Sequence, residues 1–373
     1  MDNIRPTWAE IDLAVIQRNF TQIRNKAGKA RVMAVVKANA YGHGVREVAG
    51  VCAQNGADFF GVATLEEALE LYECGFGIPI LVLGYIPPAY AREVVRCGIR
   101  ATVFNEELAL AMSKEAGRQG IPGYIHLKMD TGMGRIGFKP GPEALETILR
   151  INRLPGLILE GIYTHFAVAD WADKTYTFEQ FHQFNQWIAQ LERRGINIPI
   201  KHCSNSAGLI DLAETVSLDM VRAGIILYGL YPSAEVKREE LPITPAMRLK
   251  SRIAFIKTME PGQTVSYGRT YRCDRVLRVA TVPIGYADGY SRRLSNRTWG
   301  VVRGQKAPQI GTICMDQCMF DITGLEGVEE GDEIILFGRP EDGVTADDLA
   351  DIMGTINYEV ICAVSSRVPR IYL

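Results

Sequence analysis

Short apolar runs alternate with amphipathic segments through roughly the first 240 residues of the chain. The runs are rich in Val, Ile and small residues, as in strands that are buried on both faces of a parallel sheet. The intervening segments repeat apolar residues at helical spacing, and one further such segment, residues 11–26, precedes the first strand. The predicted strands are residues 32–37, 59–63, 78–84, 100–104, 124–130, 157–166, 198–205 and 220–228. The clearest helices between them are residues 65–74, 105–118 and 175–194.

The number and length of these strand–helix units indicate the fold class. Eight parallel strands, each followed by a helix, fit a closed (β/α)8 barrel of about 250 residues. An open, doubly wound sheet is an alternative that the pattern does not exclude. We predict an α/β protein with a TIM-type barrel, whose functional residues lie at the C-terminal ends of the strands.

The pattern changes after about residue 240. Apolar and polar side chains alternate in residues 247–259, and the segment 231–244, with its Pro and charged residues, is the expected linker. We divide the chain into a barrel domain, residues 1–240, and a mostly β C-terminal domain, residues 241–373. Further strands of the second domain are predicted at residues 276–282, 300–302, 309–314 and 333–337, with one helix at residues 346–353.

Composition narrows the functional classes. The chain has 373 residues, is 47% hydrophobic and carries a net charge of -2, so it offers a large core and no basic surface for nucleic acid or a membrane. No apolar run approaches the ~20 residues of a transmembrane helix, and residues 1–6 have no signal-sequence core. The 8 cysteines include no C-x-x-C pair and no zinc-ligand cluster accompanies them. We therefore expect reduced thiols, no bound metal and a cytoplasmic location.

Lys37 ends the first predicted strand and is the most informative residue of the chain. Burying an ammonium group is costly unless the group is paired or neutralised. One interpretation is a lysine that snorkels from a strand end, and the other is an amine that forms an imine with a carbonyl cofactor. The following residues favour the second, because Tyr41 and His43 are polar and ring-bearing, and Gly42 and Gly44 allow the backbone to approach a ligand.

A second lysine, Lys128, lies inside a predicted strand and is expected to point into the barrel. A buried cation needs a partner. Arg135 cannot neutralise it, so either Asp130 pairs with Lys128 or its charge is chemically altered. Other polar residues at the predicted strand ends are Tyr41, His165, Asn205, Ser206 and Arg222.

The loop after that strand contains a formal G-x-G-x-x-G match at residues 132–137, which is the fingerprint of dinucleotide binding. The fingerprint requires glycines that open directly into a helix. Here a stretch rich in Pro and Gly intervenes, and the helical pattern begins only near Pro142. An NAD-dependent dehydrogenase is therefore a remote alternative.

The last two strand units end in residues that suit a phosphate group. Ser206 supplies a hydroxyl, and the backbone N–H groups at Gly224 and Ile225 can complete an anion cradle. Phosphate sites after the seventh and eighth strands are common in this barrel, although ordinary turn chemistry is the alternative. Arg222, a planar and permanently charged donor, suits a heteroaromatic cofactor nitrogen beside that cradle.

Three residues of the C-terminal domain stand out by their context: Tyr267 in S-Y-G, Met315 in I-C-M-D-Q and Tyr358 in N-Y-E. Tyrosines in β domains are mostly packing residues, so each is weak evidence alone. Their meaning depends on the motifs elsewhere in the chain.

The motifs occur in one order along the chain: K-A-N-A-Y-G-H-G, D-T-G-M-G-R-I-G, H-C-S-N-S, R-A-G-I-I-L-Y-G, V-S-Y-G-R-T-Y, G-Y-A-D-G-Y, I-C-M-D-Q and I-N-Y-E-V. Together they resemble the motifs of the bacterial alanine racemase family. The resemblance extends from Lys37 to Tyr358 and therefore covers essentially the whole chain. It implies a (β/α)8 barrel followed by a β-stranded domain, with pyridoxal 5'-phosphate as the cofactor.

By this resemblance, Lys37 corresponds to the lysine that binds the cofactor covalently and acts as one acid–base. Tyr267 resembles the opposing acid–base, which the other subunit of a homodimer supplies. Arg222 resembles the arginine that faces the pyridine nitrogen, and His165 its supporting histidine. Lys128 resembles a lysine that is often carried as a carbamate, which would remove the problem of a buried cation. The implied phosphate contacts are Tyr41, Ser206, Gly224, Ile225 and Tyr358, and the implied substrate contacts are Arg135 and Met315.

The implied reaction is the interconversion of L-alanine and D-alanine, which supplies D-alanine for peptidoglycan. Racemisation requires two acid–bases on opposite faces of a planar intermediate. Lys37 from the barrel and Tyr267 from the second domain can meet this requirement. The closest rival is a serine or broad-specificity racemase. A related decarboxylase is disfavoured by Arg222, because an acidic residue is usual at that place, and a barrel-only cofactor carrier is disfavoured by the second domain.

Overall fold

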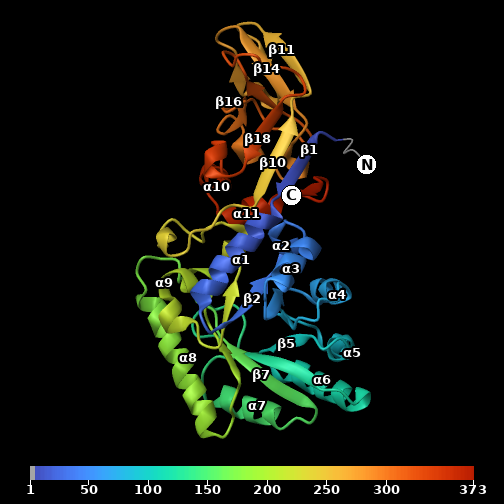
Figure 1. Ribbon diagram of the computed structural model, residues 1–373, viewed down its shortest axis with the longest axis vertical. Helices are drawn as coiled ribbons and strands as arrows, with labels where there is room; N and C mark the ends of the chain where they lie inside the picture. Colours follow the sequence, from blue (N-terminus) through green and yellow to red (C-terminus); the bar gives the residue numbers. More distant parts are fainter. Residues whose placement is uncertain (1–4) are drawn as a thin grey trace.

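The computed structural model describes residues 5–373. Residues 1–4, part of the segment in which no signal sequence is expected, lie outside the described residues. The molecule is elongated, with a barrel at one end and a strand-rich domain at the other (Figure 1). No helix among residues 5–373 is long and apolar enough to cross a bilayer.

Eight parallel strands form the barrel sheet, in the order β8-β7-β6-β5-β4-β3-β2-β9. Backbone hydrogen bonds from Asp219 N to Lys201 O (3.0 Å) and from Arg222 N to Ser204 O (3.1 Å) join the β9 segment to the β8 segment. The ring is thereby closed, so the predicted barrel is confirmed and the open, doubly wound alternative is wrong. The strands are β2 (Arg31–Val35), β3 (Phe59–Val62), β4 (Ile80–Val82), β5 (Arg100–Val103), β6 (Gly123–Lys128), β7 (Leu157–Tyr163), β8 (Ile200–His202) and β9 (Met220–Ala223).

Helices surround this sheet, and their ends follow from local sequence. Asp12 caps α1 by accepting a hydrogen bond from Val15 N (2.9 Å), and α1 ends at Gly28, whose φ of 60° suits glycine. The apolar stripe of α1, including Phe20 and Ile23, is buried against the barrel. The helices are α1 (Leu13–Ala27), α2 (Lys37–Tyr41), α3 (Val45–Gln54), α4 (Leu65–Glu73), α5 (Ala91–Arg96), α6 (Glu106–Gln119), α7 (Pro142–Asn152), α8 (Thr175–Arg193) and α9 (Ser206–Val216).

The second domain is built on a sheet of nine strands, in the order β11-β14-β17-β16-β15-β18-β10-β1-β19. Both ends of the described chain enter it, because β1 (Thr7–Ile11) pairs with β10 (Met247–Arg252) on one side and with β19 (Arg370–Tyr372) on the other. The division of the chain at residue 240 remains our proposal. β1 lies before this division in the sequence, but it pairs with strands that lie after it. The other strands are β11 (Phe255–Met259), β12 (Thr264–Val265), β13 (Tyr271–Arg272), β14 (Leu277–Val282), β15 (Trp299–Val302), β16 (Gln305–Ile310), β17 (Cys318–Asp321) and β18 (Glu333–Phe337). Helices α10 (Ala346–Met353) and α11 (Asn357–Ala363) complete the domain.

The strands β1, β12, β13, β17 and β19 were not predicted, and three further segments differ from the sequence-based expectation. The last barrel strand ends at Ala223, and residues Ile225–Tyr228 form a 3₁₀ turn, although all of them are buried and apolar. The predicted strand 309–314 instead ends at Ile310, because the chain turns at Gly311, whose φ is 73°. Helix α11 was not predicted, because its short apolar pattern resembles that of a strand.

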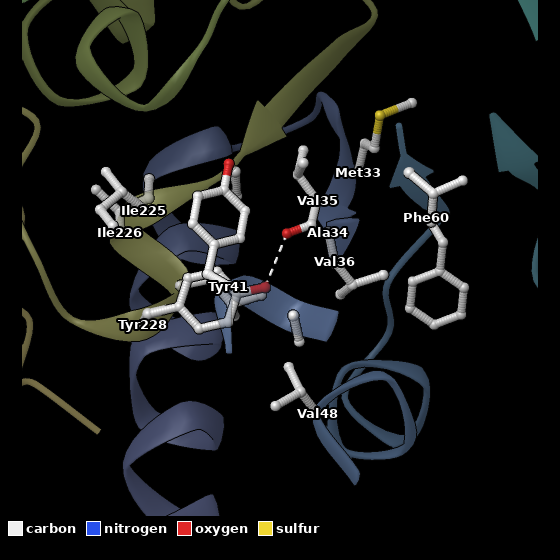
Figure 2. Close-up of a cluster of buried hydrophobic side chains, with 14 of the residues drawn as sticks. Met33, Ala34, Val35, Val36, Tyr41, Val48, Phe60, Ile225, Ile226 and Tyr228 are labelled. Carbon is white, nitrogen blue, oxygen red and sulfur yellow. Dashed lines mark hydrogen bonds between the residues drawn. The ribbon is translucent and has the colours of Figure 1, made fainter. Parts of the chain in front are cut away.

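A buried cluster ties the first barrel strand to the 3₁₀ turn (Figure 2). Tyr228 is fully buried, and its hydroxyl donates a hydrogen bond to the carbonyl of Val35 (2.9 Å). Its ring lies 4.7 Å from the ring of Tyr41 and 4.6 Å from that of His43. The cluster therefore fixes the backbone at the point where the chain leaves β2 for Lys37.

We predict that Tyr228→Phe lowers the free energy of unfolding by about 1–3 kcal/mol, because the buried Val35 carbonyl loses its side-chain donor. Urea unfolding followed by circular dichroism measures the change. The control is Tyr72→Phe, which removes a hydroxyl from a half-exposed ring. Equal stability of the two variants would show that the buried hydrogen bond contributes nothing.

Candidate active site

The C-terminal end of the barrel opens into a cavity of about 570 Å³. Its walls come from the ends of several barrel strands, from the start of α9 and from the Tyr358 region of α11. The structure thus brings together residues that lie more than half the chain apart. The sequence-predicted residues that line the cavity are Lys37, Tyr41, Lys128, Arg135, His165, Ser206, Arg222, Gly224, Ile225 and Tyr358.

Lys37 is followed by a left-handed turn, in which Ala38, Asn39, Ala40 and Tyr41 all have φ of 51–52°. This conformation costs about 1–2 kcal/mol per residue for L-amino acids, so the surroundings must hold it. Glu67 of α4 does so by accepting a hydrogen bond from Ala38 N (2.7 Å).

The other carboxylate oxygen of Glu67 accepts from Ala63 N (2.7 Å) and from Thr64 N (3.3 Å). Asn39 adds a second tie, because its side chain accepts from Val45 N (2.8 Å) at the start of α3. Sequence reasoning missed Glu67. The capping-box spacing from Thr64 to Glu67 was the available signal.

Gly42 and Gly44 serve a different purpose from the one expected. A Cβ on Gly42 would lie 2.6 Å from the carbonyl oxygen of Ile361, and one on Gly44 would lie 1.9 Å from the hydroxyl of Tyr372. Both glycines therefore allow the C-terminal domain to approach the turn closely. The expectation that they allow a ligand to approach is wrong. His43 is buried away from the cavity against Tyr228.

The surroundings of Lys37 favour its neutral amine. Burial lowers the pKa of Lys37, and the nearby charge of Arg135 lowers it further. The amine lies 6.0 Å from the centre of the Tyr41 ring. Lys37 therefore has a larger neutral fraction than an ordinary lysine, and the neutral amine can act as a nucleophile or a base.

Hydroxyl and backbone donors converge at one corner of the cavity. Gly224 N donates to Ser206 Oγ (3.1 Å), and a Cβ on Gly224 would lie 3.1 Å from Tyr41 Oη and 3.5 Å from Ser206 Oγ. Ser206 begins α9, whose N-terminus favours an anion. Burial raises the pKa of Tyr41, so its hydroxyl stays a donor. The corner is a cradle for an anion about the size of phosphate.

Arg222 enters the cavity from β9 with its guanidinium group almost fully buried. Its nitrogens donate to the carbonyls of Thr164 (2.9 Å) and Cys203 (3.1 Å), and to Nδ1 of His165 (3.1 Å) and of His202 (3.1 Å). Among residues 5–373 no carboxylate forms an ion pair with it. Burial lowers the pKa of Arg222 to about 10, so the group remains a cation at neutral pH.

Lys128 is buried, and its amine donates to the carbonyl of Met129 (2.8 Å). Burial, with a smaller contribution from the charge of Arg222, lowers the pKa of Lys128 to about 7. Asp130 does not form an ion pair with it in the described chain, and instead accepts from Gly132 N and Gly134 N, both at 3.0 Å. The first of the two alternatives for this lysine is therefore wrong.

The glycine-rich loop also does not open into a helix, since α7 begins at Pro142. Glu160, the acidic residue that follows, is engaged by His126 and Arg100 inside the barrel. The loop therefore lacks the strand–turn–helix geometry of a dinucleotide site.

Tyr267 and Met315 lie in the second domain and do not line the cavity of their own chain. Both are unusually exposed for their types, at 71% and 52%. The loop that carries Tyr267 is nevertheless well held, because Thr312 Oγ1 donates to the Tyr267 carbonyl (2.8 Å) and Ser266 Oγ to the Thr312 carbonyl (2.5 Å). The backbone of Tyr267 is thus held in place, while its side chain is exposed.

Comparisons with known proteins give the same family for both parts of the chain. Two family models match, "Alanine racemase, N-terminal domain" over residues 11–232 and "Alanine racemase, C-terminal domain" over residues 246–372. An alanine racemase of Clostridium perfringens is 50% identical over 371 residues, covering 99% of this chain and 96% of that protein. One of Methanococcus maripaludis is 48% identical over 370 residues, covering 99% of each.

Solved structures give the same result. An alanine racemase of Clostridium difficile superposes with a TM-score of 0.95 at 42% identity, covering 100% of this chain and 97% of that one. Another, from Bacillus anthracis with bound L-Ala-P, superposes with a TM-score of 0.93 at 37% identity, covering 100% and 96%. Since both domains match, in order and over nearly every residue, the chain belongs to the alanine racemase family.

Proposed function

We propose that the chain interconverts L-alanine and D-alanine, with Lys37 and the Tyr267 of a second subunit as the two acid–bases. The observation that carries the proposal is the convergence of Lys37, the Ser206–Gly224 anion cradle and the buried Arg222 on one cavity, in a chain whose relatives are alanine racemases. In a bacterium the product D-alanine would serve peptidoglycan synthesis in the cytoplasm.

The residues of the cavity fit pyridoxal 5'-phosphate. Tyr41, Ser206, Gly224 and Ile225, with Tyr358 behind Tyr41, would hold the phosphate, because a Cβ at Gly224 would intrude on the space between the two hydroxyls. Arg222 would face the pyridine nitrogen and Lys37 would hold the cofactor covalently. When bound, the cofactor withdraws electron density from the substrate Cα and so acidifies its proton.

Lys37 and Tyr267 would then exchange protons with the two faces of the substrate Cα. The lowered pKa of Lys37 gives its Nζ a neutral form that can accept a proton. Arg222 donates to His165 Nδ1, which places the proton of a neutral His165 on Nε2. Burial, and then the charge of Arg222, lowers the pKa of His165 well below 6.5, which keeps that ring neutral.

Arg135 is the expected partner of the substrate carboxylate, with Met315 of the second subunit closing the pocket. We propose that Lys128 is carbamylated and pairs with Arg135. Its pKa of about 7 leaves a neutral amine, which adds CO₂ and releases a proton to give the anionic carbamate. A bound carbamate would also remove the cost of a buried ammonium group.

The competing functions have weaker support. A decarboxylase would need an acidic residue where Arg222 lies, and a dehydrogenase would need the loop at residues 132–137 to open into a helix. A racemase for serine differs from the proposal only by one hydroxyl on the substrate. Parallel chiral assays with alanine and serine separate these two.

We predict that Lys37→Ala abolishes covalent attachment of pyridoxal phosphate and lowers racemisation by at least about 10²–10⁴-fold, since the variant loses one acid–base. Borohydride reduction followed by mass spectrometry measures attachment. Lys29→Ala, at an exposed lysine, is the control. A variant at residue 37 that still carried the reduced cofactor would contradict the assignment.

Tyr267→Phe is expected to leave cofactor binding intact and to lower kcat by about 10²–10⁴-fold. Visible absorbance measures the bound cofactor, and a chiral assay measures kcat. The matched control is Tyr90→Phe, which removes a hydroxyl from another exposed tyrosine. Unchanged incorporation of solvent deuterium into both enantiomers would exclude Tyr267 as a base.

The shared site makes a distinct prediction for mixed subunits. Inactive Lys37→Ala chains and inactive Tyr267→Phe chains should regain activity when they exchange subunits. One of the two sites in each heterodimer then carries both defects and the other carries neither. If each site were built from one chain, every site would keep one defect and mixing would restore nothing.

A further inference from the structure

A chain of hydrogen-bonded side chains crosses the interior of the barrel and ends at Arg222. Arg222 Nη1 lies 3.1 Å from His202 Nδ1, and His202 Nε2 lies 3.0 Å from His126 Nδ1. His126 Nε2 lies 3.0 Å from Glu160 Oε2. Arg100 holds the same carboxylate with two hydrogen bonds, of 3.0 and 3.1 Å. None of these interactions is used in the two-base reaction.

The chain runs from the cavity to the opposite end of the barrel. Arg222 lines the cavity, whereas Arg100 is the first residue of β5 and Glu160 is the middle residue of β7. Both histidines between them are fully buried. The end of the chain at Glu160 is partly exposed, since 15% of its side chain is accessible.

Neighbouring residues pack closely against both histidines. A Cβ on Gly161 would lie 2.3 Å from His126 Nδ1, so glycine is required beside that ring. The ring of Tyr163 stacks on His202 with centres 4.7 Å apart and planes 15° apart. The hydroxyl of Tyr163 is tied in turn to Thr102 Oγ1 (2.8 Å).

Only one arrangement of protons satisfies every bond in the chain. A guanidinium group can only donate, so His202 Nδ1 must accept. A neutral His202 therefore carries its proton on Nε2 and donates it to His126 Nδ1. His126 then also carries its proton on Nε2 and donates it to the carboxylate of Glu160. A proton on the Nδ1 of either ring would oppose a second donor.

The charges agree with this arrangement. Burial would raise the pKa of Glu160, but its hydrogen bonds with His126 and Arg100 hold the pKa at about 2, so the group is a carboxylate. Burial lowers the pKa of His126 and, together with the charge of Arg222, that of His202, so both rings are neutral.

We propose that Glu160 positions Arg222 from the opposite end of the barrel, by fixing the proton positions of the two histidines between them. Glu160 and His126 touch neither cavity nor substrate, so they are positioning residues. The ionised carboxylate makes His202 Nδ1 an acceptor, and this acceptor orients one edge of the Arg222 guanidinium group. The consequence for catalysis rests on the function proposed above, whereas the proton positions do not.

Glu160→Gln tests the proposal because an amide cannot meet both demands on residue 160. If its NH₂ group faces His126, the proton of each histidine moves to Nδ1 and His202 opposes Arg222. If its NH₂ group faces Arg100, this group and the guanidinium group of Arg100 are both donors and cannot form a hydrogen bond with each other. We expect a mixture of histidine tautomers and a fall in kcat of about 10–100-fold, as for loss of an outer hydrogen-bond partner at metal sites.

Nitrogen NMR of ¹⁵N-histidine-labelled holoenzyme reads the tautomers directly, since the chain has only 5 histidines. Two matched variants serve as controls. Arg100→Gln breaks the ion pair but leaves the carboxylate on His126, so it should keep both protons on Nε2 and most of kcat. Glu106→Gln breaks the exposed Glu106–Arg150 pair, which has no histidine attached, and should change nothing.

Each outcome decides a separate point. Nε2 protons retained on both histidines in Glu160→Gln would overturn the proposal, and so would equal loss of kcat in Arg100→Gln, which would reveal a merely structural ion pair. If Glu160→Gln does not fold, the wild-type spectrum still tests the idea, because an Nδ1 proton on either histidine contradicts it. An absence of racemisation in the wild type would instead refute the proposed function and leave the tautomer result standing.

Discussion

The burial of Arg222 without a carboxylate partner is the constraint on which the site depends. Removing a guanidinium group from water is costly, and here carbonyl oxygens and imidazole nitrogens replace the water. These neutral acceptors solvate the guanidinium group of Arg222 but carry no negative charge that would neutralise it. Burial lowers the pKa of Lys128 and of His165, and the charge of Arg222 lowers both further, so the buried cation reinforces the neutral forms of its neighbours.

The site is also a product of the contact between domains. The left-handed turn after Lys37 is held from the barrel side by Glu67 and is covered from the other side by α11 and β19, which approach closely only because residues 42 and 44 are glycines. Arg370 adds a hydrogen bond from its Nε to the Gly42 carbonyl (2.9 Å). Contacts from both domains thus fix the position of Lys37, although Lys37 itself follows a barrel strand.

The sequence was sufficient to predict the elements with strong periodicity. The barrel strands other than β9, together with α4, α6, α8 and α10, lie within a few residues of their predicted bounds, because their apolar patterns have a single period. Most of the polar cavity-lining residues could be predicted as well, since parallel strands bring their C-terminal ends to one place. Family motifs, and not physical pattern alone, singled out Tyr267 and Met315.

Other features could not be predicted from sequence for identifiable physical reasons. Of the four left-handed residues after Lys37, only Asn39 has a side chain that favours that conformation, so the turn is imposed by tertiary contacts. The bond between His126 and Glu160 joins the neighbouring strands β6 and β7, which are 34 residues apart in the sequence, and no local spacing records it. β1 is only 5 residues long, and its partners lie hundreds of residues away.

The pairing of β1 has a consequence for biosynthesis. Thr7 meets Ser251, which lies 244 residues later, and Ala9 meets Arg370 near the end of the chain. A ribosome adds about 5–20 residues per second, so the first strand waits for its neighbours while the whole barrel is made. Contacts of such long range are slow to form. β1 can therefore pair with β10 once residues 247–251 are made, but its other edge stays unpaired until β19 at residues 370–372 has been added.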